Sequence, residues 1–161
     1  MILIALGANL PSECGPPAAT LAAALGRLEA LGLNIVSVSS FYKSPAWPDP
    51  SEPPFVNAVA AIRTGLQPPE LLCLLHKVET EFGRMRSVPN APRTLDIDLI
   101  DQDGLVRCGD VVLPHPRMAD RSFVLAPLCE IAPDWVHPVT GATAAVLLAA
   151  RPDRGVPRRL A

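Results

Sequence analysis

The chain has 161 residues, of which 49% are hydrophobic, and its 14 basic and 16 acidic side chains give a formal net charge of −2. That length and hydrophobic content predict a single domain spanning residues 1–161 with a core of its own. The near-neutral balance excludes a protein whose whole surface binds nucleic acid or anionic lipid, and the uncharged stretches fall short of the roughly 18 apolar residues that a membrane span needs.

The amino terminus and the cysteines indicate a cytoplasmic protein. The chain starts Met-Ile-Leu-Ile-Ala-Leu-Gly and has no basic residue before Arg27, which does not fit the charged start of a signal peptide. The four cysteines are widely spaced and form no CxxC pair, so we expect reduced thiols.

The hydrophobic pattern predicts alternating strands and helices in the amino-terminal two thirds of the chain. We expect strands over 2–6, 34–42, 55–64 and 95–100, helices ending near Gly32 and Gly83, and a stiff proline-rich loop over 45–54. After these come a tight turn at Asp103-Gly104 into 105–113, helices over 122–131 and 143–150, and a frayed end over 151–161.

This order of elements predicts the fold class. The elements follow one another as strand, helix, strand, strand, helix and strand, which is the split pattern of ferredoxin-like folds. We therefore expect an α+β domain with a βαββαβ core, a mainly antiparallel sheet and C-terminal additions. Helices packed on the sheet should cover one face and leave the other face and its loops for a ligand.

The segment Thr94-Leu95-Asp96-Ile97-Asp98-Leu99-Ile100 carries the strongest chemical signal. Alternate side chains of a strand share a face, so Asp96 and Asp98 should project together while their neighbours enter the core. Two adjacent carboxylates repel, and a hard divalent cation, Mg²⁺ when phosphates are present, relieves that repulsion.

Three arginines precede this strand, namely Arg84, Arg86 and Arg93. Guanidinium groups bind phosphate oxygens bidentately and stay charged, so a metal beside them would suit phosphoryl-type transfer. The alternative is that the two aspartates form the solvated face of an edge strand, with the arginines reflecting an arginine-rich composition.

These residues resemble the signature of the 6-hydroxymethyl-7,8-dihydropterin pyrophosphokinase family. The resemblance rests on five ordered blocks that span nearly the whole chain: Leu6 to Leu10, Ser39 to Pro45, Phe55 to Ala58, Pro92 to Asp98 with the preceding Gly83 to Arg86, and Pro114-His115-Pro116 leading to Arg121 to Leu128.

The resemblance implies transfer of a pyrophosphoryl group from ATP to the hydroxymethyl oxygen of the dihydropterin, with release of AMP, in folate biosynthesis. It implies two Mg²⁺ ions held by Asp96 and Asp98, and a catalytic set of Arg84, Arg93, Asp96 and Asp98.

The resemblance also assigns the two substrates to separate groups of residues. The pterin is expected to stack between Phe55 and Phe123, to be recognised by Asn57, and to be lined by Ser44, Pro45 and Trp47. The expected ATP contacts are Arg84, Arg86, Arg93, Arg121, His115, Glu79 and His76. A phenylalanine taken alone is more often a core residue, and a histidine such as His76 is as often a surface residue.

Two other classes of protein share parts of this pattern. A palm-type nucleotidyltransferase also places strand carboxylates around two metals, but it releases pyrophosphate. An RNA-binding ferredoxin-like module is disfavoured because the sequence lacks clustered sheet aromatics and a net basic charge. The resemblance implies ATP and the dihydropterin as partners, and we expect no nucleic acid, no membrane and a monomeric chain.

Overall fold

The computed structural model describes residues 1–46, 49–84, 91–151 and 157–160. The strands are β1 (Ile2–Ala8), β2 (Asn34–Val38), β3 (Tyr42–Ser44), β4 (Phe55–Arg63), β5 (Asp96–Gln102) and β6 (Arg158–Arg159). The helices are α1 (Pro17–Ala30), α2 (Pro68–Glu81), the short 3₁₀ helix η1 (Met118–Asp120), α3 (Ser122–Ile131) and α4 (Ala144–Ala149).

The strands form one antiparallel sheet in the order β5-β1-β4-β3-β6, with β2 also paired to β4. β5 is an edge strand, because it stands at the end of the sheet and, among the described strands, pairs only with β1. The α+β class with a βαββαβ core and a mainly antiparallel sheet is confirmed.

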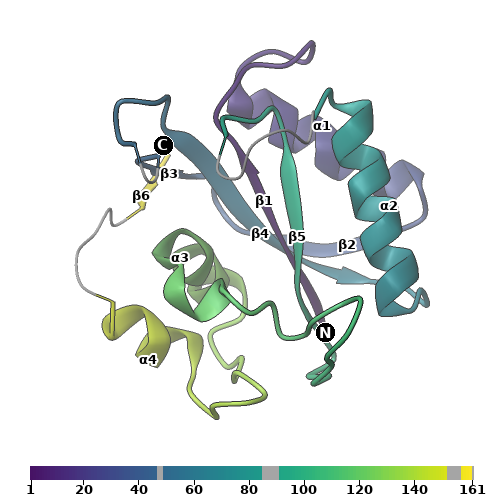
Figure 1. The fold of residues 1–161 in the computed structure, drawn as a ribbon, viewed down its shortest axis with the longest axis vertical. Coiled ribbons are helices and arrows are strands. Elements are labelled where there is room, and N and C mark those ends of the chain that lie inside the picture. Colours follow the sequence, from purple (N-terminus) through teal and green to yellow (C-terminus); the bar gives the residue numbers. More distant parts are fainter. Residues whose placement is uncertain (47–48, 85–90, 152–156, 161) are drawn as a thin grey trace.

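Helices cover both faces of the sheet, and this corrects the expectation that they would cover one face only. Figure 1 shows α1 and α2 on one side of the sheet and α3 on the other, with α4 beside α3. One core cluster joins Ile4 and Leu6 to α1 and α2, while a second joins Leu3 and Ala5 to α3. Because successive side chains of β1 point to opposite faces, this strand contributes to both clusters.

The boundaries of α2 and α4 follow from their terminal residues. α2 begins at a pair of prolines and is preceded by a capping box in which Gln67 and Glu70 exchange hydrogen bonds. It is followed by Gly83, which has a φ of 78° that side chains rarely adopt. Thr143 caps α4 by accepting the N–H of Val146. These helices lie where the sequence predicts them.

The predicted strand over 34–42 is two strands, β2 and β3. Ser39 interrupts it, because its hydroxyl accepts the Val59 N–H at 3.0 Å in place of a backbone carbonyl. The next N–H, of Ser40, donates to the Glu130 carboxylate on α3 at 3.1 Å. The Ser39 N–H still donates to the Val59 carbonyl at 2.9 Å, so these side-chain contacts alter the ladder to β4 at the junction of β2 and β3 without removing it.

Two further segments differ from expectation. The predicted turn at Asp103-Gly104 is present, with φ values of 53° and 71°, but the 105–113 segment is a loop held by an isolated bridge between Arg107 and Leu113. The end of the chain is not frayed throughout, because β6 pairs with β3.

All four cysteines lie within the described residues and are free thiols. Among the helices of the described chain, none is both long and apolar enough to cross a membrane.

Candidate active site

The two aspartates of β5 lie on the face of the sheet that carries α3. Ile97 and Leu99 are in the core between the sheet and the first two helices, so Asp96 and Asp98 point to the opposite side. Their side chains are 23% and 32% exposed, respectively. The shared face predicted from the sequence is therefore observed, and both carboxylates are partly exposed to solvent.

Gly7 lies between the predicted pterin residues and the first aspartate. In the sheet register it pairs with Asn57 of β4 on one side and with Asp96 of β5 on the other. A Cβ atom at Gly7 would lie only 3.2 Å from Asn57 Oδ1, which is tighter than ordinary contact. Glycine at this position thus leaves room for the Asn57 amide.

Asp96 is held by two arginines. Arg84 pairs with its Oδ1, and Arg93 Nη1 lies 2.6 Å from its Oδ2. Burial raises the pKa of Asp96, but the two guanidinium groups outweigh burial and hold that pKa below its usual range. The carboxylate is therefore ionised at neutral pH.

Glu79, on α2, connects the helix to this edge of the sheet. Its Oε1 accepts the Ile97 N–H at 2.8 Å and pairs with Arg84 Nη1 at 2.5 Å. An edge strand has backbone N–H groups without a strand partner, and Glu79 satisfies one of them. Burial raises the pKa of Glu79 to about 7; the Ile97 N–H and Arg84 oppose that shift, and Asp96 adds to it.

Asp98 has a looser set of partners. Arg121 Nη1 lies 3.2 Å from its Oδ2, and His115 Nε2 lies 3.9 Å from the same atom. His115 Nδ1 accepts the Arg117 N–H at 3.1 Å, so in the neutral ring the proton is on Nε2 and faces Asp98. Burial lowers the pKa of His115; Asp98 raises it and Arg121 lowers it. The net lowering favours the neutral ring.

Two of the three arginines that pair with these aspartates also lie beside the predicted pterin-stacking rings. Arg93 Cζ is 5.8 Å from the centroid of Phe55, and Arg121 Cζ is 5.6 Å from the centroid of Phe123. Both distances fall within the range of cation–π contact. Neither phenylalanine is fully buried. The rings are therefore available at the edges of the carboxylate site.

Asn57 is buried, and its amide is oriented by a neighbour. Its Nδ2 donates to Ser44 Oγ at 2.9 Å, and Ser44 is itself buried. This bond uses one of the two amide hydrogens and leaves the other hydrogen and the carbonyl oxygen for a ring edge. Pro45, which follows Ser44 in the chain, is exposed.

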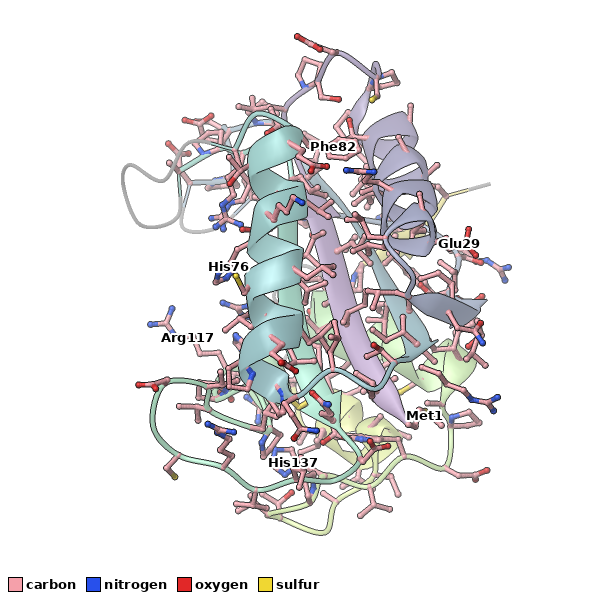
Figure 2. All side chains as sticks on the ribbon, turned by 90° about the vertical axis from the view of Figure 1, so that its right-hand side faces the viewer. Met1, Glu29, His76, Phe82, Arg117 and His137 are labelled. Atoms are coloured by element: carbon pink, nitrogen blue, oxygen red, sulfur yellow. The ribbon has the colours of Figure 1, made fainter. Side chains whose placement is uncertain are left out.

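Three further residues were predicted for the site, and of these only His76 lies within the described residues. His76 is half-buried on α2, on the side turned away from α1 (Figure 2). Trp47 and Arg86 lie outside the described residues, so their roles stay predictions.

Sequence reasoning assigned no role to two residues near the end of β1 and in the adjoining turn. Gly7 and Asn9 belong to the first family block, and the structure places Gly7 against Asn57 and Asn9 against the backbone of Arg93. The sequence feature that could have indicated a role for these two residues is a glycine and a short amide at the end of a buried strand.

Known proteins resemble this chain over most of its length. Residues 3–133 match the family model of 7,8-dihydro-6-hydroxymethylpterin-pyrophosphokinase (HPPK). The chain belongs to this family. The HPPK match covers every described site residue named above.

Named relatives extend the match over most of the chain. A 2-amino-4-hydroxy-6-hydroxymethyldihydropteridine pyrophosphokinase of Synechocystis sp. is 41% identical over 143 residues, which are 88% of this chain and 71% of that protein. The protein of the same name from Pseudomonas aeruginosa is 40% identical over 159 residues, covering 98% of this chain and 95% of its own. The folic acid synthesis protein fol1 of Pneumocystis carinii is 35% identical over 141 residues, but these are 18% of its length and 87% of this chain.

Proposed function

We propose that this HPPK-family chain transfers the pyrophosphoryl group of ATP to the hydroxymethyl oxygen of 6-hydroxymethyl-7,8-dihydropterin, giving AMP and the pterin diphosphate. The observation that carries the proposal is the convergence of Asp96, Asp98, Arg93 and Arg121 on one edge of the sheet beside Phe55. Family membership over residues 3–133 supports the same reaction.

Asp96 and Asp98 fit the binding of Mg²⁺, and we propose two ions. Within the described residues no group of three or more acidic, histidine or cysteine side chains could form a complete metal site. Mg²⁺ does not need one, because it binds through one or two carboxylates together with substrate phosphates and water. Bound there, Mg²⁺ would neutralise phosphate charge and polarise the reacting oxygens.

The arginines bind and orient the triphosphate. Each of three arginines, Arg84, Arg93 and Arg121, already pairs with a carboxylate oxygen of the site. A guanidinium group can bind phosphate oxygens in the same way, through charge-assisted hydrogen bonds. Charge that develops on the transferred group is stabilised by these fixed cations. Arg86, Glu79, His76 and His115 complete the proposed nucleotide side.

The pterin occupies the side of the site formed by β3, β4 and the start of α3. Phe55 and Phe123 stack on the flat ring, and the Asn57 amide, held by Ser44, binds its edge. We assign Pro45 and Trp47 to the pterin as well, as the family resemblance implies. With the pterin bound in this way, we expect its hydroxymethyl group to face β5, which carries Asp96 and Asp98.

We also propose that the chain acts in the cytoplasm, as a monomer and without a nucleic-acid partner. The net charge of −2 and the free thiols support this setting.

Product analysis tests the proposal. The chain is supplied with ATP, Mg²⁺ and 6-hydroxymethyl-7,8-dihydropterin, and the nucleotide products are separated by chromatography. We expect AMP to form in equal amount to the pterin diphosphate, and chelation of Mg²⁺ to stop the reaction. Release of pyrophosphate would indicate a nucleotidyltransferase instead, and ADP would indicate transfer of one phosphoryl group.

A further inference from the structure

The Asn9 side chain joins two segments that are far apart in the sequence. It follows β1 directly, is 3% exposed, and uses both ends of its amide. Its Oδ1 accepts the Arg93 N–H at 2.8 Å, and its Nδ2 donates to the Pro53 carbonyl at 3.0 Å. A buried amide with donor and acceptor both satisfied fixes the distance between its two partners.

One of these partners belongs to the nucleotide side of the site. Arg93 pairs with Asp96, and its carbonyl accepts the N–H groups of both Asn9 and Leu10 at 3.1 Å. Both peptide groups of Arg93 are therefore held by residues 9 and 10. The position of this guanidinium relative to β5 depends on the turn that follows β1.

The other partner belongs to the pterin side. Pro53 lies two residues before Phe55, at the end of the proline-rich loop that leads into β4. The Phe55 ring in turn contacts the Arg93 guanidinium at 5.8 Å. Asn9, Arg93, Phe55 and Pro53 thus form a closed ring of contacts that crosses from one half of the site to the other.

We propose that Asn9 is a positioning residue that couples the pterin half-site to the nucleotide half-site. The inference rests on the proposed function, because it takes Phe55 as a pterin contact and Arg93 as a phosphate contact. Asn9 touches neither substrate. Through its two hydrogen bonds, Asn9 transmits a displacement of the Pro53 segment to the Arg93 backbone. A displacement of the Arg93 backbone is transmitted to the Pro53 segment in the same way.

Only an amide of this length satisfies both partners at once. An aspartate in place of Asn9 would have nearly the same shape and would still accept the Arg93 N–H, but it would face the Pro53 carbonyl with an oxygen and sever that link. The substitution Asn9→Asp therefore removes one end of the connection and keeps the other. The substitution Asn9→Ala removes both ends.

The coupling between the binding of the two ligands can be measured. This coupling would not change on substitution of Asn9 if Asn9 only stabilised the fold. If the half-sites are coupled, a non-hydrolysable ATP analogue with Mg²⁺ changes the dissociation constant of the dihydropterin by a factor, and the dihydropterin changes that of the analogue by the same factor. Titration calorimetry on the whole chain measures this factor from pterin binding with and without the analogue.

We expect a coupling factor of about fivefold or more in the unmodified chain and a factor within about twofold of 1 in Asn9→Asp and Asn9→Ala. The matched control is Ser39→Ala, which also removes a buried hydrogen bond, to the Val59 N–H, but touches neither segment. It should lower the midpoint of thermal unfolding and leave the coupling factor unchanged.

Each remaining outcome decides the matter. Asn9→Asp with an unchanged coupling factor would show that Asn9 only stabilises the fold, while the proposed function would stand. An unmodified chain that binds both ligands without coupling would overturn the role of Asn9 alone. An unmodified chain that does not bind the dihydropterin would overturn both proposals.

Discussion

Asp96 and Asp98 are two residues apart on one strand and point to one face, yet their surroundings differ. Asp96 is shared by Arg84 and Arg93 and lies beside buried Glu79, which also binds the backbone of β5. Asp98 has Arg121 at 3.2 Å and a neutral His115 beyond hydrogen-bond distance. The first carboxylate belongs to a network that ties α2 to the sheet, and the second is free to act mainly on a ligand.

The largest effect on stability is expected at Glu79. Replacing Glu79 by Ala leaves the buried Ile97 N–H without an acceptor and leaves Arg84, among the described residues, paired with Asp96 alone. The change should lower the free energy of unfolding by about 3 kcal/mol. Urea unfolding measures the loss. Glu79→Gln is the matched control, since its amide oxygen can still accept the Ile97 N–H, and it should lose less. Equal losses in the two variants would place the stabilisation in the charge rather than in the backbone contact.

A smaller effect should separate the two aspartates. Asp96→Asn removes the charge that holds two arginines and should cost about 2 kcal/mol of unfolding free energy, whereas Asp98→Asn should cost less than about 0.5 kcal/mol. The isosteric amide avoids a cavity in both cases. If the two variants unfold at the same urea concentration, the contrast between the networks is wrong.

The smallest effect on stability is expected for the arginine–carboxylate pair that joins α1 to α2. Arg27 of α1 and Glu81 of α2 form two hydrogen bonds, at 2.7 and 3.1 Å, but both side chains are exposed to solvent. Glu81→Gln should leave both the unfolding midpoint and turnover close to those of the unmodified chain, because solvent screens exposed pairs. A loss as large as that of Asp96→Asn would mean that burial does not decide the value of these pairs.

The local part of the site could be predicted from sequence, because alternation along a strand is a local property. The pattern of Ile97 and Leu99 against Asp96 and Asp98 was enough to place both carboxylates on one face. The βαββαβ core followed from the same kind of pattern. Periodicity also predicted the helix that ends near Gly83, which is α2.

The parts that the sequence did not reveal depend on contacts between distant segments. Glu79 is 18 positions from Ile97 in the chain, and Asn9 is 84 positions from Arg93. The break between β2 and β3 requires Glu130 of α3, and β6 is two residues long, too short to carry a pattern. No periodicity in a single segment encodes such pairings.

Turnover by Asp98→Asn tests the central claim most directly, because this variant should keep its fold. The rate of AMP formation from ATP, Mg²⁺ and the dihydropterin is measured beside the urea unfolding curve of the same preparation. We expect kcat/KM to fall by about a thousandfold, equivalent to about 4 kcal/mol of transition-state stabilisation, with an unchanged unfolding midpoint. A stable Asp98→Asn variant that turns over within about tenfold of the unmodified chain would contradict the claim that this carboxylate serves the reaction.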